Sequence, residues 1–368
     1  MSSSKIYHIA VLPGDGIGPE VTDEAIRVLK AASSASGFSL AFEQCLVGGA
    51  ALDACDDPLP DVTLASCRKA DAVLLGAVGG PAWDDRKGSK RPERGLLKLR
   101  KGLGVFANLR PVGVSSSLAA YSPLRAERVA GTDVLIVREL TGGIYFGEPR
   151  GEMKTGGERV AANTMRYAEQ EIARLARLAF TWAERRAGRV TSVDKANVLE
   201  VSQLWRDVVT QVRRDEYPHI TLNHLYVDNA AMQLMRDPRQ FDVVVTGNLF
   251  GDILSDLAAT LPGSLGLLPS ASVGGQVGLF EPVHGSAPDI AGQGKANPIG
   301  AILSSAMLLD ELGEAVAARA VRRSVAAALD AGFRTADLTG KGGSSVSTSD
   351  MGDYVANVVI QTLSEVVQ

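Results

Sequence analysis

The chain has 368 residues, 45% of them hydrophobic, and a formal net charge of −4 at pH 7. This length and apolar content predict two domains with substantial hydrophobic cores and exclude a disordered chain. The small net charge, with both signs interspersed, gives no electrostatic case for binding nucleic acid or an anionic membrane. The sequence also contains no apolar run of about 18 residues, so no transmembrane helix is predicted.

Cysteine use and the N-terminal segment predict a cytoplasmic protein. The three cysteines, Cys45, Cys55 and Cys67, are an odd number without a C-x-x-C pair, so neither a disulfide framework nor a zinc site is predicted. The N-terminal segment Met1–Lys5 leads into the apolar run 6–12, which is too short and too soon interrupted by Pro13-Gly14 for a secretory signal peptide.

The N-terminal region predicts alternating strands and helices. An apolar run over residues 6–12 predicts a strand, and residues 13–20 predict a loop leading into a helix that ends near Ser36, before Gly37. The glycines of this loop suggest the dinucleotide fingerprint G-x-G-x-x-G, but Pro19 stands where its last glycine is required, and no acidic residue ends the next strand as expected. An ordinary Rossmann site is therefore not predicted. Strands over 38–44 and 71–76, with a helix over 61–69, follow.

Three arginines follow in quick succession. A long polar loop over 77–94 precedes a short helix over 95–101, in which Leu96 and Arg100 share a face and Leu97 lies beside them. An extended stretch over 105–112 contains Arg110, and a strand over 133–139 contains Arg138. One surface arginine is usually a solvated charge, but three on neighbouring strand ends and loops favour binding of two substrate carboxylates. The glycine-punctuated segment 140–147 predicts a hairpin or an exposed arm.

The middle of the chain predicts a long helix over 164–186, with a buried stripe of Ile172, Leu175, Ala176 and Ala179. A strand over 191–198 follows, and Lys195 lies where it should end. The pattern leaves open whether Lys195 is a salt-bridged structural residue or a functional one. A helix over 201–215 and a strand over 221–227 come next, and Asp228 closes that strand.

Two aspartates follow a short buried strand over residues 243–245. The Thr-Gly-Asn at 246–248 predicts the turn into a helix, where Asp252 and Asp256 stand four residues apart on one face. Two like charges repel unless a cation lies between them, and Mg²⁺ or Mn²⁺ accepts carboxylate oxygens. A solvated acidic helix face is the alternative, but open α/β sheets place ligands beyond such strand ends. Asp228 is a candidate third ligand.

The C-terminal third begins with a glycine- and serine-punctuated segment over 264–272. A long loop over 279–292 is predicted next, and loops of this length in compact domains usually have a function. A helix from Asn297 to Leu309 and helices over 315–329 and 349–366 are predicted to complete the chain.

Three long motifs carry a family resemblance. Residues 12–20 (LPGDGIGPE), 247–256 (GNLFGDILSD) and 284–290 (HGSAPDI) resemble the β-decarboxylating hydroxyacid dehydrogenases that act on isocitrate and isopropylmalate, and the match runs nearly end to end. The resemblance implies an α/β fold of two domains on an open sheet with helices on both faces, unlike an ordinary Rossmann fold. Residues 1–105 and 263–368 would form a cofactor-binding domain, and 106–262 a second domain with a dimerisation arm and the metal and substrate residues. A homodimer with shared active sites is also implied.

The resemblance implies a role for each candidate residue. Arg100, Arg110 and Arg138 would clamp the malate carboxylates. The aspartates Asp228, Asp252 and Asp256 would hold one Mg²⁺ or Mn²⁺ and, in the case of Asp228, also contact substrate, with Asp228 and Lys195 supplied by the partner subunit. Lys195 would be the general base, which requires its neutral form, and Tyr145 would help to protonate the enolate left by loss of CO₂. The alternative for Tyr145 is a packed aromatic on the arm.

Specificity and cofactor choice are narrower expectations. Isocitrate-using relatives place a polar residue where a third carboxylate is held, whereas Leu96 and Leu97 here suit an isopropyl group. Asp289 resembles the acidic residue that binds an adenosine ribose diol and would repel a 2′-phosphate, which favours NAD over NADP. Glu93 and Val198 complete the expected substrate pocket, and the other expected cofactor-binding residues are Glu281, His284, Gly285, Ser286, Ala287 and Asn297.

The expected reaction is therefore NAD-dependent oxidative decarboxylation of (2R,3S)-3-isopropylmalate to 4-methyl-2-oxopentanoate and CO₂, a step of leucine biosynthesis. A relative acting on malate, tartrate or another 3-alkylmalate is the nearest alternative. A non-catalytic regulatory subunit is a further one, but such a protein should have lost Lys195, Tyr145 or one of the aspartates, and all are present.

Overall fold

The computed structural model describes residues 5–339 and 343–367; the first four residues of the N-terminal segment discussed above lie outside this part. The chain divides into two compact units, Met1–Val105 with Gly263–Gln368 (unit 1) and Phe106–Pro262 (unit 2). Within the described residues, every helix is too short or too polar to span a lipid bilayer.

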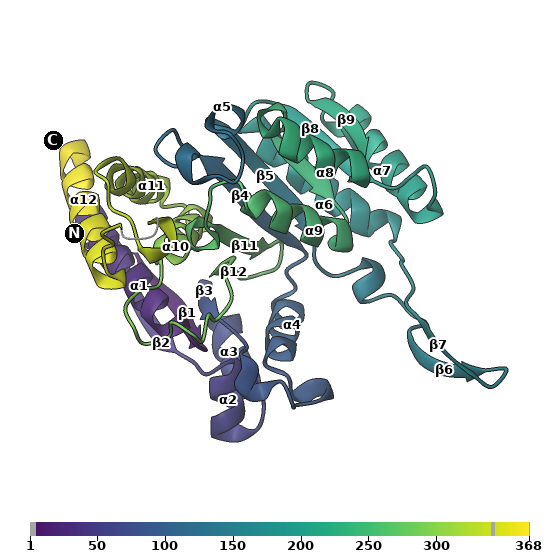
Figure 1. The fold of residues 1–368 in the computed structure, drawn as a ribbon, viewed down its shortest axis with the longest axis horizontal. Helices are drawn as coiled ribbons and strands as arrows, with labels where there is room; N and C mark the ends of the chain where they lie inside the picture. Colours follow the sequence, from purple (N-terminus) through teal and green to yellow (C-terminus); the bar gives the residue numbers. More distant parts are fainter. Residues whose placement is uncertain (1–4, 340–342, 368) are drawn as a thin grey trace. The chain divides into compact units, whose positions relative to one another are not determined.

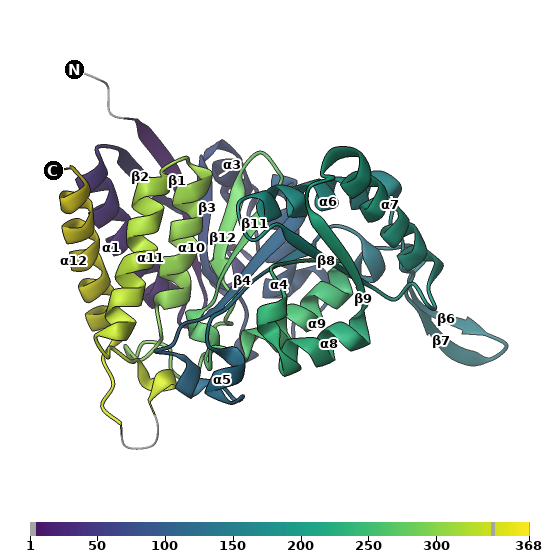
Figure 2. The same cartoon turned by 90° about the horizontal axis from the view of Figure 1, so that it is seen from above.

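Unit 1 is built on a mixed sheet with strand order β2-β1-β3-β12-β11. Its strands are β1 (Ile6–Gly14), β2 (Ser39–Gln44), β3 (Ala72–Ala77), β11 (Pro269–Val273) and β12 (Gly278–Pro282). All neighbours run parallel except β11 and β12, which are antiparallel. Helices α1 (Gly18–Ser36), α10 (Ile299–Glu311), α11 (Ala315–Asp330) and α12 (Thr348–Val367) cover one face, and α2 (Gly48–Cys55), α3 (Asp61–Lys69) and α4 (Pro92–Leu103) lie on the other (Figures 1 and 2). Because helices cover both faces, β3 is buried along its whole length.

Within unit 2 the main strands follow the order β4-β5-β10-β8-β9. Its strands are β4 (Ala107–Val114), β5 (Thr132–Glu139), β8 (Arg189–Asp194), β9 (Thr221–Tyr226) and β10 (Val243–Thr246). Only β4 and β5 pair antiparallel. Helices α6 (Glu169–Glu184) and α7 (Glu200–Glu216) lie on one face, and α8 (Val227–Arg236) and α9 (Asn248–Ala259) on the other (Figure 2). A short helix, α5 (Ala126–Val129), precedes β5.

A hairpin of β6 (Gly151–Thr155) and β7 (Glu158–Ala162) extends away from the rest of unit 2 (Figure 1). We call this hairpin the arm. Short 3₁₀ turns complete the chain; they are Pro81–Trp83, Gly88–Lys90, Ala119–Tyr121, Gly143–Tyr145, Pro238–Gln240, Leu265–Leu267 and Ala336–Leu338.

The predicted α/β class is confirmed, and so is the departure from an ordinary Rossmann fold. An all-parallel, doubly wound sheet would not contain the antiparallel pairs β4–β5 and β11–β12. Helix α1 ends as predicted before Gly37, which adopts a left-handed conformation with φ of 78°. The stripe predicted for α6 is buried at every position named above.

The predicted loop over 279–292 was partly wrong, because it contains the end of β12, and strand β11 within the segment 264–272 was not predicted. The polar residues Ser270, Ser272 and Glu281 are all buried within these strands. Both strands are buried on both faces, so they lack the alternation of apolar and polar residues that reveals a strand in sequence.

The hairpin predicted over residues 140–147 was also misplaced. That segment contains the 3₁₀ turn Gly143–Tyr145, whereas the hairpin lies at residues 151–162. Gly156 and Gly157 join its strands with φ of 61° and 89°. Positive φ at both positions is the requirement of a two-residue hairpin turn, which glycine meets without strain.

Several predicted boundaries moved, three of them at site residues or helix starts, and α2 and α8 were not predicted. Helix α4 begins at Pro92, because proline is favoured in a first helical turn, so Glu93 is helical. Helix α6 begins only at Glu169, where the Glu171 side chain accepts a hydrogen bond from the Ala168 backbone N–H at 2.7 Å. Strand β8 ends at Asp194, so Lys195 follows the strand.

Candidate functional site

Arg138 is the centre of a charged cluster in unit 2. It lies on β5, which pairs with β10, and α9 begins directly after β10, so the first turn of α9 faces it. The side chain of Arg138 is only 8% exposed. Its Nε and Nη2 donate to Oδ1 of Asn248 at 3.2 and 2.9 Å, and its Nη1 forms an ion pair with Asp252. Both partners come from α9, so strand and helix are tied together through one guanidinium.

Tyr145 joins this cluster from the 3₁₀ turn after β5. Its hydroxyl donates to Oδ2 of Asp252 at 2.8 Å. Burial raises the pKa of Tyr145, and the hydrogen bond to the Asp252 carboxylate raises it further. The phenol therefore remains protonated at neutral pH and has a proton to donate.

Arg110 and Asp256 complete the arrangement, which we call the Arg138 cluster (Arg110, Arg138, Tyr145, Asp252 and Asp256). Nη1 of Arg110 lies 3.8 Å from Oδ1 of Asp256, and its Nε donates to Asn108 at 2.6 Å. Asp252 and Asp256 project from one face of α9, as the spacing predicts. The cluster thus presents two guanidinium groups, which suit carboxylate ligands, beside two carboxylates, which suit a divalent cation.

Lys195 and Asp228 lie elsewhere in unit 2. Lys195 follows β8, Asp228 lies in the first turn of α8, and Nζ is 3.1 Å from Oδ2. Lys195 lowers the pKa of Asp228 chiefly through this contact. Among the residues that the structure describes, no three Asp, Glu, His or Cys side chains are arranged to hold a metal ion, so Asp228 does not join Asp252 and Asp256 within one chain.

The unit 1 candidates begin with one face of α4. Glu93, Leu96, Leu97 and Arg100 recur at helical spacing on this face. Nη2 of Arg100 lies 2.6 Å from Oε1 of Glu281 on β12, and Nε of Arg100 is buried without a hydrogen-bond partner among the described residues. Leu97 is 37% exposed. In unit 2, Val198 is 62% exposed, so both apolar side chains are accessible to a ligand.

The loop after β12 contains the cofactor candidates and rests on the N-terminal glycine loop. The backbone N–H of Ile17 donates to the carbonyl of Ser286 at 2.7 Å. A Cβ on Gly16 would lie 1.9 Å from that carbonyl oxygen, so only glycine permits this approach. The glycine loop that resembles a dinucleotide fingerprint therefore supports the 284–290 loop.

Side chains within this loop suit a polar ligand. Nδ1 of His284 lies 2.9 Å from the Gly285 carbonyl, while its Nε2 is buried and has no partner in the described part of the chain. Burial lowers the pKa of His284, so its ring is neutral near pH 7. Asp289 is exposed, whereas Asn297 is buried and bonded to Asp337 and to the Ile299 N–H, each at 3.0 Å.

Sequence reasoning missed Asp15, which organises the loops of unit 1. Its carboxylate is 4% exposed and accepts hydrogen bonds from the backbone N–H groups of Gly49, Ala50 and Gly79, each at 2.8 Å. Burial raises the pKa of Asp15 against the opposing effect of these bonds. A carboxylate between glycines at the end of a buried strand was the available signal.

Comparison with known proteins places this geometry in a family. The sequence profile described as isocitrate/isopropylmalate dehydrogenase matches residues 8–355. The chain is 67% identical over 356 residues to a 3-isopropylmalate dehydrogenase of Salinibacter ruber, covering 97% of this chain and 96% of the relative. It is 57% identical over 350 residues to the enzyme of that name from Oleidesulfovibrio alaskensis, covering 94% and 98%.

A solved structure agrees with this assignment. The crystal structure of an isocitrate dehydrogenase from Methylococcus capsulatus aligns with a TM-score of 0.85 and 36% identity, over 96% of this chain and all of that one (100%). The chain belongs to the isocitrate/isopropylmalate dehydrogenase family. The predicted family and the predicted class of enzyme, an oxidoreductase that acts on a small molecule, are confirmed.

Proposed function

We propose that this protein oxidises and decarboxylates (2R,3S)-3-isopropylmalate to 4-methyl-2-oxopentanoate and CO₂ with NAD, in leucine biosynthesis. The observation that carries the proposal is the Arg138 cluster, where carboxylate-binding and cation-binding groups lie side by side. Relatives that are 55–67% identical and named 3-isopropylmalate dehydrogenase support this substrate over isocitrate.

Arg110 and Arg138 would bind the carboxylates of the substrate, and Arg100 of unit 1 has the role that the resemblance implies. Each planar guanidinium can donate two parallel hydrogen bonds to one carboxylate. The ion pairs with Asp252 and Asp256 keep both arginines in place before substrate arrives. Tyr145, protonated and hydrogen-bonded to Asp252, would return a proton to the enolate after loss of CO₂.

A divalent cation fits the donor set of the cluster. Asp252 and Asp256 offer the hard carboxylate oxygens that Mg²⁺ and Mn²⁺ prefer, and Asp228 of the partner subunit would be the third ligand. When bound, the ion would acidify the substrate hydroxyl and stabilise the enolate.

Lys195 of the partner subunit would take the hydroxyl proton. In the structure Nζ of Lys195 pairs with Asp228 at 3.1 Å, so this pair must open before the amine can reach the substrate hydroxyl.

NAD fits the loop after β12. Nε2 of His284, which has no partner among residues 5–339 and 343–367, can form a hydrogen bond with the cofactor. The exposed carboxylate of Asp289 suits a ribose diol and would repel the 2′-phosphate of NADP. The rest of the cofactor pocket would be formed by Glu281, Gly285, Ser286, Ala287 and Asn297.

The substrate pocket would accept an isopropyl group and leave a further carboxylate unpaired; its residues are Leu96 and Leu97, with Glu93 and Val198. Small substrates such as malate or tartrate would also enter an apolar pocket and remain the alternative.

A homodimer would bring these parts together. A two-stranded hairpin is at best marginally stable alone in water, yet the arm exposes Met153 by 46% and Val160 by 41%. Helices α8 and α9, which lie next to each other, also expose apolar side chains: Met232 of α8 is 63% exposed and Ile253 of α9 is 55% exposed. A second copy of the chain covering these surfaces would remove apolar area from water and supply Lys195 and Asp228 in trans.

One assay tests the proposal. NADH formation should be fastest with isopropylmalate among isopropylmalate, malate, tartrate and isocitrate, should stop with a chelator and should return with Mn²⁺. Faster turnover of one of the other acids would replace the proposed substrate, and turnover that resists chelation would remove the metal.

A further inference from the structure

We propose that Asn248 and Tyr167 are positioning residues that hold the guanidinium of Arg138 while leaving its charge available to substrate. The inference rests on the proposed role of Arg138 in carboxylate binding. It concerns how the chain keeps a buried arginine from being neutralised by its own neighbours.

Asn248 orients Arg138 from the first residue of α9. Its side chain is buried, and the residue is 1% exposed. Its Oδ1 accepts from both Nε and Nη2 of Arg138, while its Nδ2 donates to the carbonyl of Gly142 at 3.2 Å. Both ends of the amide are therefore occupied, so its oxygen stays directed at the arginine.

The choice of an amide has an electrostatic consequence. Asn248 satisfies two guanidinium donors without adding a negative charge, so unlike Asp252 it does not compete with the substrate carboxylate for the charge of Arg138. Without Asn248, these buried donors would have to turn toward Asp252 or remain unpaired, and an unpaired buried donor is destabilising. An aspartate at this position would fill the same space but would largely neutralise Arg138.

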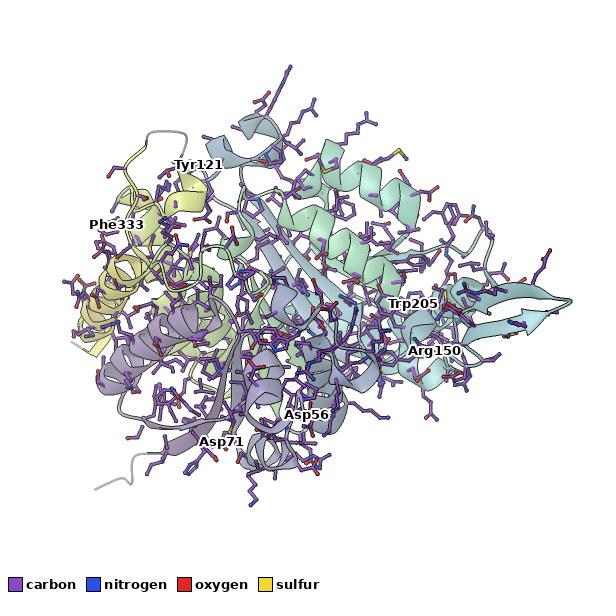
Figure 3. All side chains as sticks on the ribbon, turned by 60° about the horizontal axis from the view of Figure 1, so that its bottom comes forward. Asp56, Asp71, Tyr121, Arg150, Trp205 and Phe333 are labelled. Atoms are coloured by element: carbon purple, nitrogen blue, oxygen red, sulfur yellow. The ribbon has the colours of Figure 1, made fainter. Side chains whose placement is uncertain are left out.

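Tyr167 fixes Asn248 in turn. Its hydroxyl accepts a hydrogen bond from the backbone N–H of Asn248 at 2.8 Å, and its ring packs edge-on against Trp205 with centroids 5.4 Å apart. Trp205, on α7, is labelled in Figure 3. This contact anchors the start of α9 to a buried aromatic pair.

Glycines make the approach of Tyr167 possible. A Cβ on Gly142 would lie 2.7 Å from the ring, one on Gly143 would lie 2.4 Å from the hydroxyl, and one on Gly247 would lie 3.2 Å from it. Gly143 also has φ of 72°. The loop after β5 and the turn before α9 both lack side chains where this ring inserts, so the close packing is encoded at several positions.

Glu139 closes the network. It is fully buried beside Arg138 on β5 and accepts from the backbone N–H groups of Thr141 and Gly142 at 2.7 and 2.8 Å. These bonds fix the loop whose Gly142 carbonyl receives Asn248. Burial raises the pKa of Glu139, and burial together with the nearby Glu139 carboxyl raises that of Tyr167. Arg138 is thus held by a closed ring of contacts from β5, the following loop and α9.

The test compares Asn248→Asp and Tyr167→Phe with the control Tyr217→Phe. Tyr217 also lies in unit 2, stacks on Phe180 and bonds Thr181 through its hydroxyl at 3.2 Å, but it has no bond to the Arg138 cluster. The readouts are KM for isopropylmalate, KM for NAD, kcat, the calorimetric Kd for isopropylmalate with Mn²⁺ but without NAD, and Tm.

Asn248→Asp should raise KM and Kd for isopropylmalate about tenfold or more, because one charge-assisted interaction of about 1.4 kcal/mol is lost. KM for NAD should stay within about twofold. Tyr167→Phe should raise the same constants by a smaller factor, and the control should leave them unchanged. Equal KM and Kd in Asn248→Asp and wild type would overturn the inference, as would losses in all three variants that follow Tm alone. If the wild-type protein prefers another dicarboxylate, the proposed substrate fails, while the Kd for that acid still tests Asn248.

Discussion

Arg138 and Lys195 both lie at strands that flank β10, yet the chain surrounds them differently. The side chain of Arg138 is 8% exposed and is bonded to Asn248 and Asp252, whereas that of Lys195 is 27% exposed and pairs with Asp228, whose side chain is 63% exposed. An exposed ion pair contributes about 0–1 kcal/mol and exchanges partners easily, while a buried charge needs fixed partners. One chain therefore supplies fixed partners for Arg138, whereas the ion pair of Lys195 can open and its ammonium group can contact another partner.

The largest expected difference between Lys195 and Arg138 is in turnover. Lys195→Ala should lower kcat by about 10² to 10⁴, the usual contribution of a general base. Its free energy of unfolding should change by less than about 1 kcal/mol, because the lost ion pair is exposed. Steady-state kinetics and urea unfolding check both values. A near wild-type kcat would make Lys195 a structural residue, and a large loss of stability would contradict its open surroundings.

Arg138→Met should show the opposite balance. Removing the buried guanidinium takes one partner each from Asn248 and Asp252, so the free energy of unfolding should fall by about 2–4 kcal/mol, somewhat less than for a fully buried pair because Asp252 is partly exposed. Urea unfolding measures this, with Arg159→Met on the exposed arm as the matched control. Equal stability of the two variants would mean that the Arg138 cluster does not hold β5 to α9.

The smallest effect is expected at Asp289 in unit 1, which is exposed to solvent like the ion pair of Lys195 with Asp228. Asp289→Ala should narrow the ratio of kcat/KM for NAD over NADP by about tenfold, since the repulsion of a 2′-phosphate is removed. Stability should be unchanged. An unaltered ratio would place Asp289 outside the cofactor site.

Sequence was most informative where one local rule decided the structure. The buried run 243–245 and the spacing of Asp252 and Asp256 predicted a strand, a helix and a shared face, and the structure has all three. Gly37 likewise predicted the end of α1. The contacts that hold Arg138 could not be predicted, because Asn248, which bonds Arg138, and Tyr167, which bonds Asn248, are far from it in sequence and come together only through tertiary packing.

Errors arose where tertiary context overrides pattern. Strands β11 and β12 are buried at every position and contain serine and glutamate, so their sequences lack the expected alternation of apolar and polar residues. The prediction placed the arm at the glycines of residues 140–147, although Gly156-Gly157 is the stronger signal for a hairpin turn. That Asp228 stays apart from Asp252 and Asp256 within one described chain is a three-dimensional fact that spacing could not give.

Mixed dimers test the proposed shared site most directly. Lys195→Ala and Asp252→Asn chains, carrying different affinity tags, are co-expressed, and the dimer that carries both tags is isolated and assayed with isopropylmalate, NAD and Mn²⁺. Each variant homodimer should be nearly inactive, but the mixed dimer should contain one intact site and recover about half of the wild-type turnover per dimer. A mixed dimer as inactive as its parents would show that Lys195 and Asp252 act within the same chain and would contradict the account.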